Sequence, residues 1–129
     1  MTTGKRHSKK REAILDCIAN TEVHPSAEWI YARLKPEIPD LSIATVYRNL
    51  NLFKEEGAVM SVATVNGLER FDANTAPHVH FICECCDSII DMPLMEVPEE
   101  LMETAANQLK ASVTGCSLTF TGICNKCRK

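Results

Sequence analysis

The apolar positions in the first half of the chain recur every three to four residues in three successive segments, which predicts three amphipathic helices. The first covers residues 8–19, the second begins after Ser26 and the third covers residues 42–56. A serine before a helix can accept a hydrogen bond from its first turn, and Ser26 and Ser42 suit that role. Gly57 suits the position that stops the third helix. The positions expected to be buried are Ala13, Ile14, Cys17 and Ile18, then Ala27, Ile30, Tyr31 and Leu34, then Ile43, Val46, Leu50 and Phe53.

Two short extended runs, residues 58–65 and 68–71, follow the third helix and flank Asn66-Gly67. Asn-Gly is the strongest short hairpin signal, because a type I′ turn needs positive φ at both residues. Three helices followed by a β-hairpin is the order of a winged-helix domain, whose last helix enters the major groove of DNA. The residues expected to face DNA are Ser42, Thr45, Tyr47 and Arg48.

The helical pattern leaves a second interpretation of that surface open. Arginine can read guanine, and tyrosine or serine can bind phosphate. Tyr47 could instead pack in the core, and Arg48 could be an ordinary solvated charge. Spacing alone does not separate these two interpretations.

The net charge of −3 gives no overall attraction to DNA, but basic residues are concentrated near the N-terminus. A basic arm suits contact with phosphate groups, although a solubilising tail would have the same composition. The residues concerned are Lys5, Arg6, Lys9, Lys10 and Arg11.

The second half of the chain predicts a smaller domain of strands and one helix. Residues 79–83, 88–92 and 112–123 read as strands, and Pro98 suits the first position of a helix. The apolar face expected on that helix consists of Leu101, Ala105 and Leu109.

These elements predict an α+β protein with an N-terminal winged-helix DNA-binding domain and a small α/β dimerisation domain with antiparallel strands. We expect the first domain to cover residues 1–73, the linker residues 74–78, and the second domain residues 79–129. The linker lacks any clear apolar period.

Two Cys-x-x-Cys pairs, Cys83/Cys86 and Cys124/Cys127, are the strongest chemical signal in the chain. Structural zinc is bound tetrahedrally by four ligands, and one tight Cys-x-x-Cys turn supplies two of them. Such an ion would tie the chain end to a much earlier strand and stabilise a small domain. Unrelated or disulfide-bonded cysteines are the alternative, which the doubled spacing disfavours.

The remaining cysteines are assigned no ligand role. Cys85 is adjacent to Cys86 and cannot replace it at the same spacing, whereas Cys17 and Cys116 lie in apolar segments and are expected to be small buried residues. No apolar run approaches the ~20 residues that span a bilayer, and no apolar leader follows Met1. We therefore expect a cytoplasmic protein without a membrane partner.

Histidines and carboxylates form a second candidate metal site. A His-x-His strand points both imidazoles to one face, and imidazole with carboxylate suits iron, manganese or zinc. An ion bound by residues from both domains would fix the angle between them and so link metal binding to DNA affinity. These side chains could also be ordinary turn and strand residues. The candidate ligands are His24, Asp72, His78, His80 and Asp91.

Several of these segments occur together, in the same order, in one known family. Residues 42–50 (SIATVYRNL), 70–72 (RFD), 78–86 (HVHFICECC) and the terminal Cys-x-x-Cys resemble the ferric uptake regulator family, and the resemblance extends over about residues 8–128. It implies a winged-helix domain, an α/β dimerisation domain, a homodimer, and repression of genes when the protein is loaded with metal.

Within that family the chain is most similar to the peroxide-responsive branch, the PerR repressors. The resemblance implies that the five histidines and aspartates bind regulatory Fe²⁺ or Mn²⁺, and Asp91 stands where iron-sensing members typically have glutamate. It also implies that peroxide reacts at bound iron and oxidises His24 or His78, after which the dimer leaves its DNA operator. The structural zinc would not be the sensor.

Three other interpretations compete with a peroxide-responsive repressor. An iron- or zinc-uptake regulator of the same family is the nearest. A non-haem iron enzyme or thiol oxidoreductase is disfavoured, because the sequence shows neither a Gly-rich loop nor a βαβ context for a thioredoxin-like site, so we expect no enzyme. A zinc-stabilised interaction module without DNA binding is the third.

Overall fold

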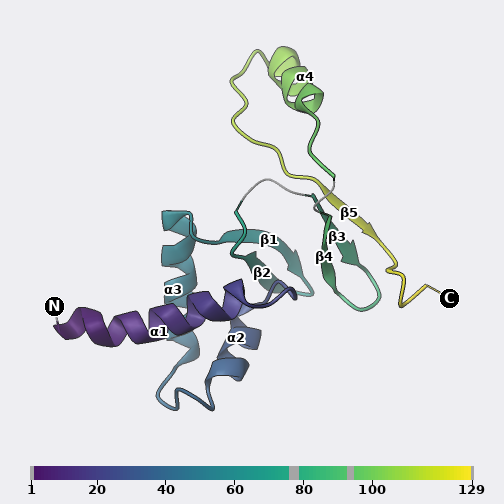
Figure 1. The fold of residues 1–129 in the computed structure, drawn as a ribbon. Helices are drawn as coiled ribbons and strands as arrows, with labels where there is room; N and C mark the ends of the chain where they lie inside the picture. Colours follow the sequence, from purple (N-terminus) through teal and green to yellow (C-terminus); the bar gives the residue numbers. More distant parts are fainter. Residues whose placement is uncertain (1, 76–78, 93–94, 129) are drawn as a thin grey trace. The chain divides into compact units, whose positions relative to one another are not determined.

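The computed structural model describes residues 2–75, 79–92 and 95–128, with side chains from residue 9 onward (Figure 1). The chain divides into two compact units between Thr75 and Ala76. No helix among the described residues is long and apolar enough to cross a membrane.

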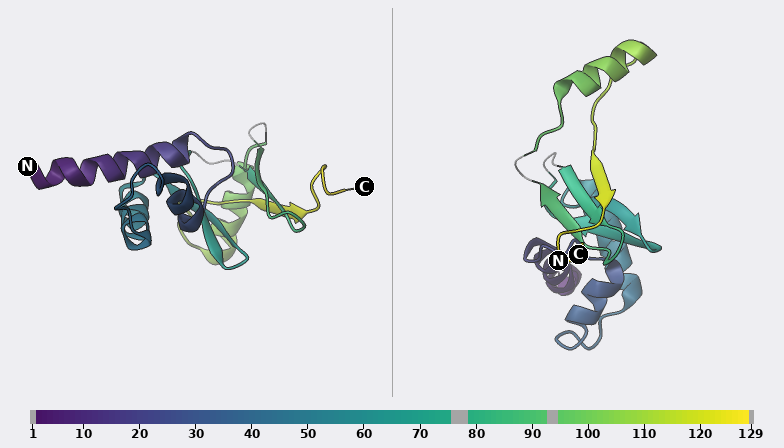
Figure 2. Two further views of the ribbon diagram at one scale, coloured as in Figure 1. Left: turned by 90° about the horizontal axis from the view of Figure 1, so that it is seen from below. Right: turned by 90° about the vertical axis from the view of Figure 1, so that its right-hand side faces the viewer.

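The first unit has the order predicted for a winged helix (Figures 1 and 2). The helices are α1 (Thr2–Ala19), α2 (Ala27–Leu34) and α3 (Ile43–Glu56), and the strands are β1 (Met60–Val65) and β2 (Leu68–Asp72). β1 and β2 form an antiparallel hairpin that closes at the Val65–Leu68 pair. Asn66 and Gly67 have φ of 51° and 79°, which confirms the predicted left-handed turn.

The predicted starts of α2 and α3 follow from local hydrogen bonds, whereas α1 begins at Thr2 rather than at the predicted residue 8. The Ser26 hydroxyl accepts from the Trp29 N–H at 3.1 Å, and the Ser42 hydroxyl accepts from the Thr45 N–H at 3.1 Å. Each serine satisfies one backbone donor that the first helical turn leaves without an intrahelical acceptor. Gly57 ends α3 with φ of 78°, the left-handed conformation that favours glycine.

One apolar core holds the first unit together. Ile14, Ile30, Val46 and Phe53, from all three helices, are completely buried, and Phe71 joins them from β2. Burial of such side chains is the main favourable term in folding, and each contributes roughly 1.5–3 kcal/mol. The three helices are therefore held by side chains that share one interior.

Several predicted core positions lie nearer the surface than the pattern indicated. Ile43 is 37% exposed because it is the first residue of α3, before the helix reaches the core. Ala13, Cys17 and Tyr31 are only partly buried, at the edge of the core. The spacing of the apolar residues identified which face of each helix is buried, but not how many residues that buried face includes.

The second unit contains β3 (Val79–Cys83), β4 (Ile89–Met92), α4 (Glu99–Leu109) and β5 (Thr119–Gly122). β3 is the central strand; β4 pairs with it antiparallel, as predicted, but β5 runs parallel to it. The sheet is therefore mixed.

The last strand is also shorter than the predicted 112–123. The segment before it contains Gly115 and Ser117 and first meets β3 at Leu118, whose carbonyl accepts from the His80 N–H at 3.3 Å. Cys116 lies in this segment and is exposed, so the prediction that it is buried was wrong.

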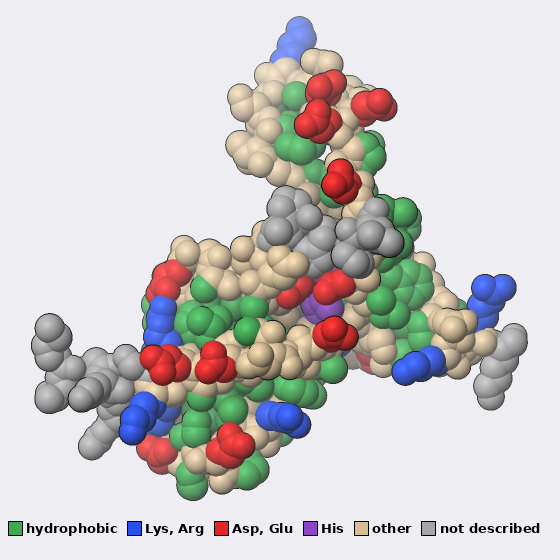
Figure 3. Space-filling model, viewed as in Figure 1, with side chains coloured by type: hydrophobic (Ala, Val, Ile, Leu, Met, Phe, Trp, Pro, Cys, Tyr) green, Lys and Arg blue, Asp and Glu red, His purple; other side chains and the backbone are tan. Residues whose placement is uncertain are grey.

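α4 differs most from its prediction. Pro98 is the N-cap rather than the first helical residue, and no residue of α4 is buried. Leu101 is 46% exposed and Leu109 is 73% exposed. In the described part of the chain, α4 packs against no other helix or strand. Figure 3 shows acidic side chains gathered over α4 with hydrophobic ones between them.

Candidate metal centres and DNA-binding face

The four cysteines of the two Cys-x-x-Cys pairs converge at one end of the second sheet. Cys83 is the last residue of β3, and Cys124 follows β5 by two residues. Because β3 and β5 run parallel, with Cys83 opposite Gly122, both turns leave the sheet side by side. The sulfur atoms of Cys83, Cys86, Cys124 and Cys127 all lie within 4.8 Å of one another. This grouping suits one tetrahedral ion.

The backbone around Cys83 is arranged to stabilise a thiolate. The Cys83 sulfur accepts three backbone N–H groups, from Cys85 at 3.3 Å, Cys86 at 3.4 Å and Cys124 at 3.3 Å. The N–H groups of Cys124 and Cys86 lower the pKa of Cys83 to about 6. A deprotonated sulfur is the form that binds zinc, so donor type and hydrogen bonding both fit the ion.

The other thiols of the group have unequal surroundings. The Cys86 sulfur lies 2.9 Å from the Ser88 hydroxyl, and the hydrogen bonds of Ser88 lower the pKa of Cys86. Contact with the thiols of Cys85 and then Cys124 raises the pKa of Cys127. All seven cysteines are free thiols, so the disulfide alternative finds no support in the geometry.

His24 and Asp72 form a pair inside the first unit. His24 is 3% exposed and has φ of 55°, and its Nε2 lies 3.3 Å from the Oδ2 of Asp72 at the end of β2. The Phe71 N–H donates to the Pro25 carbonyl at 2.9 Å, and the Arg70 guanidinium donates to the His24 carbonyl. These bonds fasten the turn before α2 to β2 and thereby position the imidazole.

His80 and Asp91 form a similar pair inside the second unit. They are direct partners on the antiparallel strands β3 and β4, and the His80 Nε2 lies 3.2 Å from the Asp91 Oδ1. His80 is buried, whereas the Asp91 side chain is 38% exposed. The fifth predicted ligand, His78, lies outside the described residues.

The first turns of α3 present the polar side chains predicted to meet DNA. Tyr47 is 41% exposed, which rules out the core alternative, and its hydroxyl donates to Glu28, whose carboxylate raises the tyrosine pKa. The Arg48 guanidinium donates to the Thr45 hydroxyl at 3.2 Å, and that hydroxyl lies 2.9 Å from the hydroxyl of Ser42. The chain of contacts runs along one exposed face.

Part of the basic N-terminal cluster is engaged within the first unit. Lys10 forms an ion pair with Asp40 at 3.2 Å, and Arg11 pairs with Glu56 while lying 4.7 Å above the Phe53 ring. These two side chains therefore help to hold α1 on the domain. The side chains of Lys5 and Arg6 lie outside the described set.

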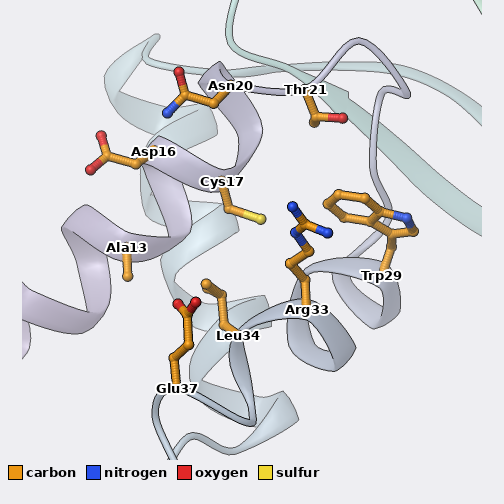
Figure 4. A pocket seen from close by; sticks show the side chains of 9 residues that line it. All are labelled: Ala13, Asp16, Cys17, Asn20, Thr21, Trp29, Arg33, Leu34 and Glu37. Carbon is orange, nitrogen blue, oxygen red and sulfur yellow. The ribbon is translucent and has the colours of Figure 1, made fainter.

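An open pocket of about 560 Å³, which no sequence motif predicted, lies beside α1 and α2 (Figure 4). It contains the thiol of Cys17 and the guanidinium of Arg33, which lies 5.7 Å from the Trp29 ring. Its walls come from separate segments whose spacing carries no motif, which is why sequence reasoning missed it. The residues that line it are Ala13, Asp16, Cys17, Asn20, Thr21, Trp29, Arg33, Leu34 and Glu37.

Comparison with known proteins places this geometry among metal-responsive regulators. Residues 2–121 match the ferric uptake regulator family. The peroxide-responsive repressor PerR of Staphylococcus aureus is 35% identical over 125 residues, covering 97% of this chain and 84% of that protein.

Solved structures give the same result. The Campylobacter jejuni peroxide stress regulator has a TM-score of 0.81 and 26% identity, covering 98% of this chain and 94% of that one. The ferric uptake regulator of Francisella tularensis, solved with iron, has a TM-score of 0.76 and 28% identity, covering 92% and 91%. The matched residues extend across both compact units.

Proposed function

Since this chain belongs to the ferric uptake regulator family, we propose that it is a metal-dependent repressor that binds operator DNA as a homodimer and responds to peroxide. The family consists of transcription regulators rather than enzymes. A repressor acts where its operator is, so we place the protein in the cytoplasm.

The proposed DNA-binding face is the exposed side of α3, with Ser42, Thr45, Tyr47 and Arg48. The contacts from Arg48 through Thr45 to Ser42 support it, because they hold polar groups in an extended row rather than folding them onto the core. Arginine at such a position can read a base edge, while hydroxyl groups contact phosphate.

The proposed dimer interface lies on the second unit. α4 has no buried residue and carries Leu101 and Leu109 on its surface, and Phe120 of β5 is 46% exposed. Large apolar side chains that a single chain leaves exposed are typical of surfaces that another subunit covers.

We assign structural zinc to Cys83, Cys86, Cys124 and Cys127, and regulatory Fe²⁺ or Mn²⁺ to His24, Asp72, His78, His80 and Asp91. Each unit contributes one histidine–aspartate pair to the second set, with nitrogen–oxygen distances of 3.2–3.3 Å. An ion that takes ligands from both pairs would select one arrangement of the two units, and thereby one spacing of the DNA-binding helices.

The two histidine–aspartate pairs are the observation that carries this proposal. Iron(II), when bound, supplies the redox chemistry that hydrogen peroxide needs. In the net reaction, one peroxide oxygen is transferred to the ring of His24 or His78 and the other leaves as water. An oxidised imidazole is a poorer ligand, so the ion is lost and DNA affinity falls with it.

The site is tested with manganese and a DNA duplex selected from a random-sequence library by the manganese-loaded protein. We expect Asp72→Asn to weaken manganese-dependent binding at least tenfold, in the range of about 10–100-fold seen when groups around a metal are altered. Asp40→Asn is the matched control, since Asp40 is exposed, lies outside both histidine–aspartate pairs and forms an ion pair with Lys10. If manganese promoted DNA binding equally in Asp72→Asn and Asp40→Asn, the assignment of Asp72 to the regulatory metal site would be contradicted.

An iron- or zinc-uptake regulator is the second candidate, favoured by the similarity to the iron-bound Francisella tularensis protein. Such a regulator would keep its DNA through peroxide treatment and would respond to the concentration of metal alone. An iron enzyme would instead turn over a co-substrate in the absence of DNA.

A further inference from the structure

The pocket between α1 and α2 takes no part in the function proposed above. It is open to solvent and encloses about 560 Å³, within the range of about 300–1,000 Å³ that is usual for small-molecule sites. Its walls come from the last turns of α1, from the turn that follows, and from α2 with the turn after it (Figure 4). A molecule bound there would contact two helices of the winged-helix domain at once.

Part of the pocket wall is flat and apolar. Trp29 contributes its indole ring, and Leu34 and Ala13 add aliphatic surface. Trp29 and Ala13 also pack against the core of the first unit, so this wall is held in place from behind. An indole ring is a large, rigid face on which another aromatic ring can stack. The wall therefore suits a ligand with a flat aromatic body.

The guanidinium of Arg33 supplies a positive charge inside the pocket. Figure 4 shows it turned toward the indole of Trp29 and the thiol of Cys17, and it lies 5.7 Å from the centre of the Trp29 ring. Glu37 stands four residues along, a spacing at which arginine and glutamate commonly pair. In the part of the chain that the structure describes, however, no ion pair joins Arg33 to a carboxylate. Its fork of N–H donors is therefore available to a carboxylate on a ligand.

The thiol of Cys17 does not compete for this charge. Burial raises the pKa of Cys17 and outweighs the nearby positive charge of Arg33, which lowers it, while the negative charge of Glu37 raises it further. The thiol is therefore neutral at neutral pH. It adds a small polarisable surface to the pocket and no anion that would neutralise the guanidinium.

The remaining polar side chains limit the charge that a ligand can carry. Asp16 and Glu37 are exposed carboxylates that line the pocket, and each would repel a second negative charge on the ligand. The Thr21 hydroxyl oxygen accepts from the Val23 N–H at 3.3 Å, which leaves the hydroxyl hydrogen to donate elsewhere. A cationic ligand is disfavoured because the guanidinium of Arg33 already lies beside the indole ring, where a cation would bind. These features favour a ligand with one carboxylate.

We propose that the pocket between α1 and α2 binds a small aromatic monocarboxylate, whose ring stacks on Trp29 and whose carboxylate accepts two hydrogen bonds from Arg33. The ligand would join α1 to α2 and stabilise the winged-helix domain, in which Glu28 of α2 also accepts from the hydroxyl of Tyr47 on the proposed DNA-binding face. The site is separate from the proposed peroxide response, because none of its residues belongs to either metal site.

Trp29 is the only tryptophan of the chain, so a single indole N–H signal in nuclear magnetic resonance spectra reports on the pocket. Full-length, zinc-loaded, nitrogen-15-labelled protein is titrated with phenylacetate, phenylacetamide and phenethylamine, which share one ring and carry negative, neutral and positive head groups. Phenylacetate is expected to shift the indole signal to saturation and to raise the melting temperature with increasing concentration. Phenylacetamide is expected to bind about tenfold more weakly or worse, because it offers Arg33 no charge.

Three variants locate the binding site. Arg33→Gln should weaken phenylacetate binding by about tenfold or more, whereas Arg33→Lys keeps the charge without the fork and should bind with intermediate affinity. Cys17→Leu, which fills the pocket from α1, should block binding although Arg33 remains. Lys9→Gln is the matched control and should bind like wild type, since Lys9 is an exposed basic residue of α1 that does not line the pocket.

The indole signal of each variant without ligand shows whether its first unit is folded. An indole signal that phenylacetate leaves unchanged in wild-type protein would overturn the proposal, as would equal affinities of wild type and folded Arg33→Gln, or of wild type and folded Cys17→Leu. Tighter binding of phenethylamine than of phenylacetate would also overturn it, because the pocket would then serve cations through Asp16 and Glu37. The titration uses no DNA, iron or peroxide, so its result is independent of the proposed function.

Discussion

Replacing the serine that begins α3 tests how the fold prepares the proposed DNA-binding face. Ser42→Ala removes the cap of the Thr45 N–H and the contact between the two hydroxyl groups. Loss of such a cap costs about 1 kcal/mol, which lowers the melting temperature of a 60–100-residue domain by about 4–8 °C. If the hydroxyl also contacts phosphate, loss of that hydrogen bond to a charged group costs a further ~1.5–3 kcal/mol of binding, or roughly 10–150-fold in affinity.

The structure provides a matched control at the start of α2. Ser26 caps Trp29 over the same 3.1 Å distance but is 5% exposed and lies off the proposed face. Ser26→Ala should lower the melting temperature at least as much as Ser42→Ala, yet leave DNA affinity unchanged below the melting point. Ser42→Gly, which costs a cap only a few tenths of a kcal/mol, should stay nearly as stable as wild type but bind DNA like Ser42→Ala.

The assays are thermal unfolding by circular dichroism and fluorescence anisotropy with the selected duplex. Equal losses of DNA affinity in Ser26→Ala and Ser42→Ala would refute the reasoning, because affinity would then follow general stability. An unchanged melting temperature in Ser42→Ala would refute the cap.

Three further predictions concern stability. Phe53→Ala should destabilise the first unit by about 3–5 kcal/mol in chemical unfolding, since the ring is completely buried; a loss below 1 kcal/mol would contradict its place in the core. Gly57→Ala should cost about 1–2 kcal/mol because φ is 78°; no described residue lies within 4 Å of an added Cβ, so the cost is backbone strain alone, and Gly57→Asn should recover part of it. Removal of zinc by a chelator should increase hydrogen exchange in residues 79–128 and leave residues 8–72 protected; uniform exchange would contradict a structural role confined to the second unit.

The first unit was predictable because local signals and the apolar period agree there. Serine caps, the Asn66-Gly67 turn and the stop at Gly57 each act over a few residues, and the same boundaries result from the periodicity. The width of each buried face depends on which neighbours cover it, and for this reason Ile43 was misplaced.

The second unit was less predictable because its order depends on contacts distant in sequence. The parallel direction of β5 follows from its approach to β3, and no local signal in residues 112–123 encodes that direction. α4 has the predicted apolar spacing but packs against no other helix or strand among the described residues, so the spacing alone does not identify what covers its apolar face.

The cysteine site could be predicted from the spacing of the two Cys-x-x-Cys pairs, since each short turn brings its two sulfur atoms together. The unequal surroundings of the thiols could not be predicted from the spacing, because they depend on how the two turns face each other. The pairings of His24 with Asp72 and of His80 with Asp91 likewise required the hairpin and the sheet register.

Peroxide treatment of the DNA-bound protein tests the central claim most directly. The protein is loaded anaerobically with zinc and either iron(II) or manganese(II), bound to the selected duplex and exposed to micromolar hydrogen peroxide. The masses of the peptides that contain His24 and His78 are then measured by mass spectrometry. The account predicts that the iron-loaded protein leaves DNA with one oxygen gained at one of these histidines, whereas the manganese-loaded protein remains bound and unmodified. Iron-loaded protein that keeps its DNA with unchanged histidine mass would contradict it.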